Sequence, residues 1–522
     1  MQNGVIHTDV EDAYSDYLCD ESRCIGSAES ISFPKTETDV CDALRWAHEQ
    51  SINVTIQCGL TGIAGGATPD GGHILNLSKM SRILGMRCDD EGVFYVTVQP
   101  GCTLKALDDA LSASEFDTKG WTEGAIAAFN TYRQSEPCTF PPDLTEAGAC
   151  LAGVVANNGS GARTYRYGPT RPHVSGLHVI LVDGDMITLS RGAAKANGRH
   201  FSLLTEAGRT LVGTLPSYTM PKVKTAAGFY ASDDMDLIDL FIGSEGVLGV
   251  ISEIEVRLTR RPHTAWGITA FFPSESSAIE FVIRVRNELD AAAIEFFSAE
   301  ALDLLRMQRA NNPAFESLPE LQDAWNTAIY VELHGDSEER VEEGGASLLD
   351  LMESCGGDPD ATWFAESARD IERFKGVRHA VPEAVNLLIA ERKKSVPELT
   401  KLGTDLSVPD SELKTIMAMY HEDLRTAKLD YVIFGHIGNN HVHVNILPRD
   451  LDDYARGKAL YLEWAKRVVA MEGSVSAEHG IGKLKTGMLE IMYGPDGIEE
   501  MRTVKRIFDP DGQLNRGTLF SW

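Results

Sequence analysis

The chain has too little positive charge to hold a polyanion. Its 522 residues contain 48 lysines and arginines against 77 aspartates and glutamates, which gives a formal net charge of −29. Proteins that bind nucleic acid hold the phosphate backbone with clustered basic residues. We therefore expect no nucleic-acid partner. The same negative field would repel a small anionic ligand, so a site for an acid needs its own local positive charges.

Long apolar runs and paired cysteines are also missing. No stretch of about 18 apolar residues occurs, so we predict no membrane span. The first 21 residues carry six acidic residues and no lysine or arginine, which is unlike a secretory signal peptide. The nine cysteines contain no Cys-x-x-Cys pair, which is typical of reduced thiols and not of disulfides or an iron-sulfur cluster. We expect a cytoplasmic protein, either free or peripheral to the membrane through a partner.

The length and local patterns predict at least two domains. A single core stops growing at about 250–300 residues, so a chain of this length divides. The first half alternates short β runs with glycine turns, as at Asp183-Gly184, where an aspartate-glycine pair predicts a hairpin. From Thr269 on, strands alternate with helices whose apolar residues recur at three- and four-residue spacing. One predicted helix, residues 368–392, is expected to break at Pro382.

Three glycine-rich segments in the first half predict one extended ligand. Residues 57–67 follow a predicted strand and place four glycines within eight residues. Successive backbone amides can then face one anion without side-chain obstruction, and a diphosphate suits such a loop. The loop is neither a Walker A loop nor a Rossmann fingerprint. Residues 150–161 and 242–251 are the other two segments; the first segment taken alone could be a flexible loop.

These segments resemble the flavin-binding domain of the vanillyl-alcohol-oxidase family, also called the PCMH-type FAD domain. The sequence Phe508-Asp509-Pro510 followed by Leu514-Asn515 resembles the closing motif of that family, although alone it would read as a simple turn. The resemblance implies FAD, held noncovalently because the first loop has no histidine. It implies FAD contacts from Gly59, Leu60, Thr61, Gly62, Gly65, Gly66, Pro100, Gly101, Gly161, Glu245, Gly246, Ile251 and Asn515.

A second group of chemically active residues lies near the C-terminus. Residues 435–445 contain three histidines, and Glu478-His479 follows later. Imidazoles together with a carboxylate can bind Zn, Mn or Fe(II). In a strand, His441, His443 and Asn445 would share one face and could converge on a point. The pattern fits either a metal site or a set of structural histidines.

The pattern Gly-His, six residues, His-x-Asn and a later Glu-His-Gly resembles the C-terminal domain of FAD-linked oxidases, such as D-lactate, glycolate and D-2-hydroxyglutarate dehydrogenases. His441 stands where these relatives commonly have asparagine, so the set of metal-binding histidines stays open. The resemblance implies a divalent ion, Zn or Mn, on His436, His443 and Glu478, a substrate contact at Asn445 and a catalytic base at His479.

Arg378 matches the arginine that pairs with the substrate carboxylate in this family; alone it would read as a solvated helix residue. The threonine found four residues later in D-2-hydroxyglutarate dehydrogenases is Pro382 here, and residues 402–409 lack the lysine of their Lys-Tyr-Asp motif. Both departures argue against D-2-hydroxyglutarate as the substrate. The implied fold is α+β: a PCMH-type FAD-binding domain (1–262), an α+β substrate or cap domain with an antiparallel sheet (263–470) and a C-terminal segment (471–522) that returns to the FAD domain.

The function predicted is that of an FAD-dependent dehydrogenase, which oxidises a small D-2-hydroxy acid such as D-lactate by proton abstraction and hydride transfer. The alternative is a flavin-carrying electron-transfer subunit of a larger glycolate or lactate oxidase complex. A third alternative is a non-redox relative such as an alkyl-glycerone-phosphate synthase, and the metal-type cluster argues against it. The chain has no cluster motif or NAD fingerprint, so an electron-transfer flavoprotein, a quinone or an iron-sulfur protein is expected as acceptor. A homodimer is one assembly left open.

Overall fold

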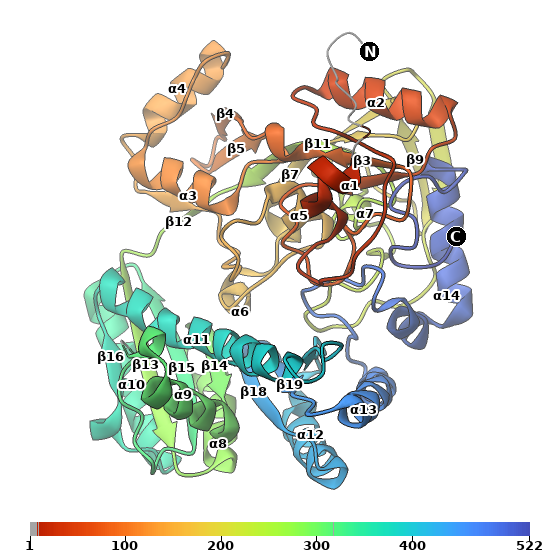
Figure 1. Ribbon diagram of the computed structural model, residues 1–522. Coiled ribbons are helices and arrows are strands. Elements are labelled where there is room, and N and C mark those ends of the chain that lie inside the picture. Colours follow the sequence, from red (N-terminus) through yellow and green to blue (C-terminus); the bar gives the residue numbers. More distant parts are fainter. Residues whose placement is uncertain (1–7, 9, 317) are drawn as a thin grey trace.

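The computed structural model describes residue 8, residues 10–316 and residues 318–522. Figure 1 shows two bodies stacked on each other. The upper body holds the chain up to β12 (Thr259–Arg260), together with the C-terminal helix α14 (Thr486–Phe508). The lower body holds the elements from β13 (Thr264–Phe272) to α13 (Leu451–Ala470). The chain therefore builds the first body, crosses to the second and returns.

The first body contains two main sheets. The smaller is parallel, with the order β1-β3-β2, and helix α2 (Glu37–Glu49) packs its apolar face on a core shared with this sheet. The larger is antiparallel, with the order β4-β5-β11-β7-β8. The predicted hairpin at Gly184 is confirmed, because β7 and β8 pair there and Gly184 has a positive φ of 75°. The strands are β1 Ser30–Ser32, β2 Val54–Gln57, β3 His73–Asn76, β4 Ile83–Cys88, β5 Phe94–Val98, β7 Val174–Ile180, β8 Met186–Ser190 and β11 Val250–Arg257.

Shorter elements complete this body. Strand β6 (Cys138–Thr139) pairs with β12, and β9 (His200–Leu204) pairs with β10 (Thr210–Thr214). The remaining helices of four or more residues are α1 Val10–Ala13, α3 Leu104–Ala113, α4 Glu123–Tyr132, α5 Leu151–Ala156, α6 Thr164–Tyr167 and α7 Ile238–Phe241.

The C-terminal segment closes the first body, as predicted. Leu514 forms a parallel bridge with Val54 of β2. The side-chain oxygen of Asn515 accepts a hydrogen bond from the Ile56 amide (2.7 Å), and its amide group donates to the carbonyl of Glu245 (2.8 Å). One asparagine thus joins the end of the chain to β2 and to the third glycine-rich segment.

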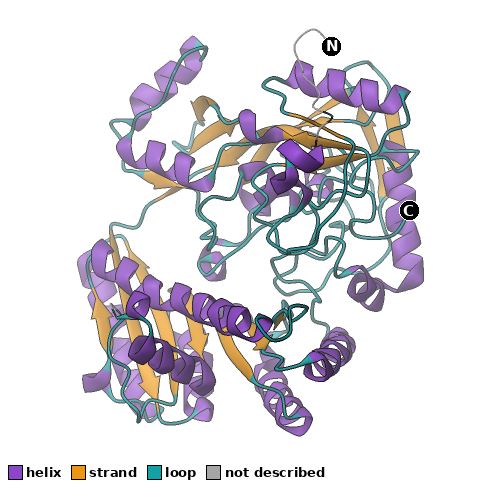
Figure 2. Cartoon of the chain, in the orientation of Figure 1, coloured by secondary structure: helices purple, strands orange, loops and turns teal. Residues whose placement is uncertain are grey.

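The second body is a seven-stranded antiparallel sheet with helices on both faces (Figure 2). Its order is β16-β13-β15-β14-β18-β19-β17. The further strands are β14 Ala291–Phe297, β15 Thr327–Gly335, β16 Trp363–Ala365, β17 Leu402–Gly403, β18 Tyr431–His436 and β19 His441–Ile446, and the helices are α8 Glu275–Glu288, α9 Ala299–Asn311, α10 Glu338–Ser354, α11 Ala368–Lys393 and α12 Leu413–Ala427.

The two faces of this sheet follow from the alternation of side chains along each strand. One face, with Phe271, Phe297 and Phe434, packs against α9 and α11. The other, with Ile294 and Phe296 among its residues, belongs to the main core with α8 and α10. Glu295 and His436 lie two residues from Phe297 and Phe434, so they point to the α9 and α11 side. This register places polar residues of the candidate site on that side.

The expected break at Pro382 was wrong. Helix α11 runs through this proline from Ala368 to Lys393. Proline cannot donate to the carbonyl four residues earlier, which here is that of Arg378. Its neighbours Val381, Ala384 and Val385 are buried in one core with α9 and the sheet. This packing outweighs the cost of the missing hydrogen bond.

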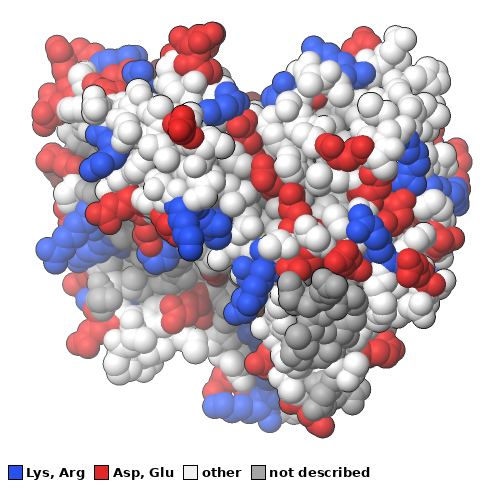
Figure 3. All heavy atoms as spheres, turned by 90° about the horizontal axis from the view of Figure 1, so that it is seen from above, with Lys and Arg blue, Asp and Glu red and all other residues white. Residues whose placement is uncertain are grey.

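Two global predictions concern the surface and the membrane. No helix in the described part of the chain is both long and apolar enough to cross a bilayer. In Figure 3 acidic side chains are spread over the whole face, and basic side chains form small separate groups among them. On this face the acidic side chains therefore do not gather in one patch.

Candidate active site

The first glycine-rich loop leaves room for a ligand along its backbone. A side chain at Gly62 would meet no atom within 4 Å, and the same holds for Gly153 in the second segment. Gly65 has a φ of 76°, which favours glycine. In the second segment the hydroxyl of Ser160 is buried without a hydrogen-bond partner among the described residues. Open glycine backbone beside an unsatisfied buried hydroxyl fits the polar groups of a bound dinucleotide such as FAD.

Two predicted FAD residues have a packing role that explains their glycine identity. A Cβ at Gly161 would lie 1.7 Å from the carbonyl oxygen of Asp143, and one at Gly101 would lie 2.7 Å from that of Leu77. The Gly161 amide donates to the hydroxyl of Thr164 (2.9 Å). These glycines therefore shape the walls of the candidate cofactor site. Of the other predicted residues, Gly59, Leu60, Thr61 and Gly66 share the first loop, Pro100 precedes Gly101, and Ile251 and Gly246 belong to β11 and the turn before it.

Glu245 ties the glycine-rich segments to the loop that carries Glu478 and His479. Its carboxylate accepts hydrogen bonds from the amides of Ile481 and Gly482, both at 2.7 Å. Burial raises the pKa of Glu245 to about 7, although these two hydrogen bonds oppose the shift. The Lys483 amide in turn donates to the carbonyl of Ala64 in the first loop (3.0 Å). The predicted cofactor residues and the loop that carries Glu478 and His479 are thus in direct contact.

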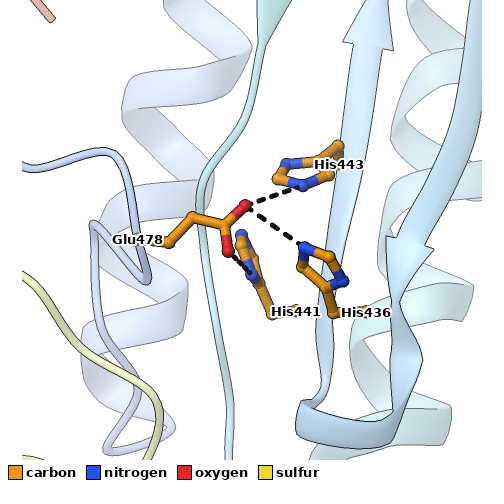
Figure 4. A group of neighbouring side chains, drawn as sticks. All are labelled: His436, His441, His443 and Glu478. Atoms are coloured by element: carbon orange, nitrogen blue, oxygen red, sulfur yellow. Dashed lines mark hydrogen bonds and ion pairs between the residues drawn. The ribbon is translucent and has the colours of Figure 1, made fainter. Parts of the chain in front are cut away.

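The predicted metal ligands meet at one atom (Figure 4). The Nε2 atoms of His436 and His443 each lie 3.3 Å from Oε1 of Glu478. His436 ends strand β18 and His443 lies in the paired strand β19, while Glu478 comes from the loop between α13 and α14. Ligand atoms of these three residues and of His441 all lie within 4.8 Å of one another. The arrangement suits a divalent cation between two imidazoles and a carboxylate.

The other ring nitrogen of each imidazole, Nδ1, has a hydrogen-bond partner of its own, which orients Nε2 toward Glu478. Nδ1 of His436 lies 2.7 Å from Oε1 of Glu295, and Nδ1 of His443 lies 3.2 Å from the carbonyl oxygen of Thr404. A proton on each Nδ1 leaves the Nε2 lone pair free for a ligand. Such outer hydrogen bonds are typical of metal-binding histidines.

His441 faces the other oxygen of Glu478 and has different partners. Its Nδ1 lies 3.3 Å from Nζ of Lys224, and its Nε2 lies 3.1 Å from Oδ1 of Asp405. Lys224 Nζ also contacts Oε2 of Glu478 at 2.5 Å. Burial holds the pKa of His441 well below its ordinary value, and Lys224 adds to this shift. The geometry therefore separates His441 and Lys224 from the pair of imidazoles at Oε1.

Arg378 adjoins this cluster through one shared carboxylate. Its Nε lies 3.1 Å from Oε2 of Glu295, and Nη2 donates to the hydroxyl of Thr145 (3.2 Å). Glu295, whose other oxygen contacts His436, is fully buried. Burial would raise the pKa of Glu295, but Arg378 and His436 outweigh it and hold this pKa below its ordinary value. Arg378 is thus a half-buried residue in an ion pair with a buried carboxylate, unlike a solvated helix residue.

His479 and Asn445 complete the predicted set. Nε2 of His479 lies 3.6 Å from Oε1 of Glu478, and Nδ1 lies 3.5 Å from Oδ1 of Asp405. Burial lowers the pKa of His479 to about 4, although both carboxylates oppose this. Asn445 is buried in β19 and pairs with Gly403 of β17. With His441 and His443 it lies on one strand face, as the sequence predicted.

Sequence reasoning missed three buried charged residues of the site: Lys224, Glu295 and Asp405. Asp405 accepts hydrogen bonds from the amides of Glu478 and His479, both at 3.1 Å, and pairs with Lys485. Lys224 approaches from a segment of the first body, 254 residues from Glu478. None of the three stands in a spacing that predicts a ligand, so the sequence offered no signal for them beyond their charge.

Comparison with known proteins defines the class. Residues 262–519 match the family described as FAD linked oxidases, C-terminal domain, and residues 28–119 match the FAD binding domain family. The chain belongs to the FAD-linked oxidases and is an FAD-linked oxidoreductase. The membership and the enzyme class predicted from the motifs are confirmed.

Relatives over nearly the whole chain are named as dehydrogenases of hydroxy acids or as a glycolate oxidase subunit. A probable mitochondrial D-lactate dehydrogenase of Danio rerio is 29% identical over 94% of this chain and 84% of its own length. A D-2-hydroxyglutarate dehydrogenase of Stutzerimonas stutzeri is 26% identical (100% and 97%), and the glycolate oxidase subunit GlcD of Bacillus subtilis is 25% identical (94% and 89%).

Solved structures confirm the fold class. p-Cresol methylhydroxylase with substrate bound superposes with a TM-score of 0.67 at 16% identity, over 99% of this chain and 94% of that chain. An alkyldihydroxyacetonephosphate synthase gives 0.58 at 13% identity, over 94% and 76%. The α+β fold with an FAD-binding body of PCMH type and an antiparallel cap sheet is therefore established.

Proposed function

We propose that the protein is an FAD-dependent dehydrogenase of small D-2-hydroxy acids, with D-lactate as a representative substrate. The observation that carries the proposal is the meeting of two imidazole Nε2 atoms at one oxygen of Glu478, next to the ion pair of the buried Glu295 with Arg378. A cation site and a carboxylate anchor then lie side by side, which is what a 2-hydroxy acid requires. The relatives named above act on substrates of this kind.

Each residue of the site has one role in this proposal. Arg378 holds the substrate carboxylate, Asn445 contacts the substrate, and Nε2 of His479 accepts the hydroxyl proton. Burial lowers the pKa of His479 to about 4, so His479 is neutral near pH 7 and one ring nitrogen carries a free lone pair. FAD would supply the acceptor for the hydride of C2, so the oxidised product would be a 2-oxo acid.

The proposal includes a divalent ion, Zn or Mn, on His436, His443 and Glu478. His441 is left out of the ligand set because its Nδ1 lies 3.3 Å from Nζ of Lys224 and its Nε2 faces Oδ1 of Asp405 at 3.1 Å. When bound, the ion acts as a Lewis acid toward the substrate hydroxyl. Glu295 and Thr404 orient the two histidines that would hold it.

We further propose that FAD is released by acid or heat and that oxygen is a poor electron acceptor. An electron-transfer flavoprotein, a quinone or an iron-sulfur protein would take the electrons of a cytoplasmic enzyme. The division at residues 262 and 470 belongs to the same proposal and follows the change from the first body to the cap sheet and back.

Anaerobic mixing of the yellow protein with D- and L-lactate, glycolate and malate tests the proposal. D-Lactate should bleach the flavin; a chelator should stop bleaching without removing FAD, and Zn or Mn should restore it. His479→Ala should keep FAD and metal but lose turnover by a factor of about 100 or more, while the surface variant His200→Ala keeps full turnover. Full activity in a protein shown by elemental analysis to be metal-free would remove the ion from the proposal.

A second candidate is a flavin-carrying subunit of a glycolate oxidase complex, which the similarity to the GlcD subunit supports. The two functions differ in what the isolated chain can do. Flavin bleaching by a hydroxy acid without partners favours the independent dehydrogenase. Bleaching only after a partner protein is added favours the subunit.

A further inference from the structure

A small cavity lies beside Arg378 on the same face of the cap sheet as Glu295. It has a volume of about 20 Å³, which is room for about one water molecule. Phe297 of β14 and Tyr330 of β15 line it from the sheet, and Leu302 of α9 and Phe374 of α11 cover it. Because Glu295 and Phe297 point the same way along β14, the cavity continues the site away from His436.

The walls are apolar except at the rim next to the first body. Phe271 and Trp363 add to the apolar part and Thr269 brings one hydroxyl, whereas Asp143, Glu332 and Arg378 stand at the rim. The cavity therefore has one charged end, at the candidate carboxylate anchor, and one apolar end inside the cap. Burial there favours a hydrocarbon group and penalises a charged one.

The cations near this rim are already paired. Arg163 contacts Glu332 at 2.6 Å and Asp143 at 3.9 Å, and Arg378 contacts Glu295 at 3.1 Å. Three carboxylates thus stand against two guanidinium groups, and among the lysines and arginines of the described chain Arg378 alone lines the cavity. A second carboxylate on the substrate would enter this space without a partner, which is costly.

We propose that this cavity is the subsite for the substrate side chain, and that it selects 2-hydroxy acids with a small apolar side chain over 2-hydroxy dicarboxylates. The inference rests on the proposed function, because it needs a carboxylate at Arg378 and a hydroxyl facing His479. The third substituent of C2 then enters the cavity. A methyl group fits with little movement of the walls, an ethyl group needs the walls to move slightly, and longer or branched groups must displace Leu302 or Phe374.

A substrate series tests the subsite in the wild-type enzyme. The D-enantiomers of lactate, 2-hydroxybutyrate, 2-hydroxyisovalerate, malate and 2-hydroxyglutarate are compared by the rate of anaerobic flavin reduction. We expect kcat/KM for lactate and 2-hydroxybutyrate to exceed that for both dicarboxylates by at least about tenfold. If none of the acids reduces the flavin, the proposed function fails. If the dicarboxylates react as well as lactate or better, the function stands and the subsite is wrong.

Two variants change the cavity in opposite directions. Leu302→Ala enlarges it and should raise the kcat/KM ratio of 2-hydroxyisovalerate to lactate about tenfold. Ala328→Leu fills it, because Ala328 also lines the cavity, and should lower the same ratio. Leu304→Ala is the matched control, because Leu304 is buried in the same helix but does not line the cavity.

Flavin content and melting temperature show that each variant is folded. If Leu302→Ala and Leu304→Ala shift the ratio equally, or if neither shifts it, the cavity is not the side-chain subsite. Should Ala328→Leu fail to fold, the Leu302 and Leu304 pair still decides the question.

Discussion

The ammonium group of Lys224 lies 2.5 Å from Oε2 of Glu478, on the opposite side of this carboxylate from His436 and His443. Burial would raise the pKa of Glu478, but Lys224 and the histidines outweigh it and hold this pKa well below its ordinary value. Glu478 is thus kept as a carboxylate by a fixed cation. The same cation lies within a few ångströms of the proposed metal position.

Removing the charge of Lys224 should therefore strengthen metal binding. A buried ammonium repels a divalent ion and competes for Glu478. We expect Lys224→Met to bind Zn or Mn more tightly by about tenfold, which is about 1.4 kcal/mol, and Lys224→Arg to stay near the wild type. Competition with a chromophoric chelator measures the affinity. Weaker binding in Lys224→Met would mean that the lysine chiefly orients Glu478.

Arg378→Lys should weaken substrate binding while FAD is retained. A lysine cannot contact Glu295 and a substrate carboxylate with one planar group. We expect KM to rise at least about tenfold, a loss of about 1.4 kcal/mol. Arg392→Lys is the control, because Arg392 lies on the same helix and pairs with Asp430. An unchanged KM in Arg378→Lys would mean that another residue binds the substrate carboxylate.

The parts of the fold that could be predicted are those with a local pattern. Strands β5, β7 and β8 and helices α8 and α9 follow from alternation and three- to four-residue spacing. Pro382 shows the limit of local rules, since the packing of Val381, Ala384 and Val385 overrides a broken hydrogen bond. Tertiary packing therefore determines that α11 continues through Pro382, which the local sequence alone does not predict.

For the site, the sequence found residues that stand in motifs. His436, His443, Glu478 and His479 come together as the resemblance implied. Glu295 is 141 residues from His436, and nothing in its neighbourhood marks it. Lys224 could likewise be found only once the two bodies are folded against each other. Contacts across such distances depend on strand register, which no short motif encodes.

Gly65→Asp should abolish FAD loading. A carboxylate there would meet the anionic diphosphate at close range, and the positive φ of 76° adds strain. Gly65→Ala keeps only the strain and should lose much less flavin. Gly92→Asp places the same side chain at another glycine of positive φ, in open space, and should load normally. The flavin-to-protein absorbance ratio measures the loading. A fully yellow Gly65→Asp protein would mean that this loop does not bind the cofactor.

His178 should make stability depend on pH. Its Nδ1 lies 3.0 Å from Glu37 of helix α2, and its Nε2 lies 3.8 Å from Glu253. The hydrogen bond to Glu37 raises the pKa of His178 above 6.5 and lowers that of Glu37 below 4.5. The histidine contribution is complete below 6.5 and is lost as pH rises through the raised pKa. The glutamate contribution is complete above 4.5 and is lost as pH falls through the lowered pKa.

The pair therefore stabilises α2 most between about pH 4.5 and 6.5. We expect His178→Gln to lower the melting temperature in this range by on the order of 1 °C, and by less above it. His263→Gln, at an exposed histidine, should show no such profile. A melting-temperature difference that is constant from pH 5 to 9 would mean that protonation of His178 is not involved.

Asp405→Asn should damage metal binding and turnover together, because Asp405 positions the loop that carries both Glu478 and His479. Its two oxygens accept the amides of these residues, the hydroxyl of Ser476 (2.6 Å) and the ammonium of Lys485 (2.7 Å). Asparagine offers one acceptor oxygen in place of two and leaves Lys485 without its buried counter-charge, at a cost of about 3–5 kcal/mol. We expect a lower melting temperature, metal affinity reduced at least about tenfold and a parallel loss of kcat, with FAD still bound. Ser476→Ala keeps the Asp405 carboxylate and its bonds to both amides and to Lys485. It removes the contacts of the Ser476 hydroxyl with Asp405, the Gly480 carbonyl and Lys485, each worth about 1 kcal/mol, and should reduce metal affinity less than Asp405→Asn does. Wild-type metal affinity in an Asp405→Asn protein of reduced stability would show that Asp405 supports folding without positioning Glu478.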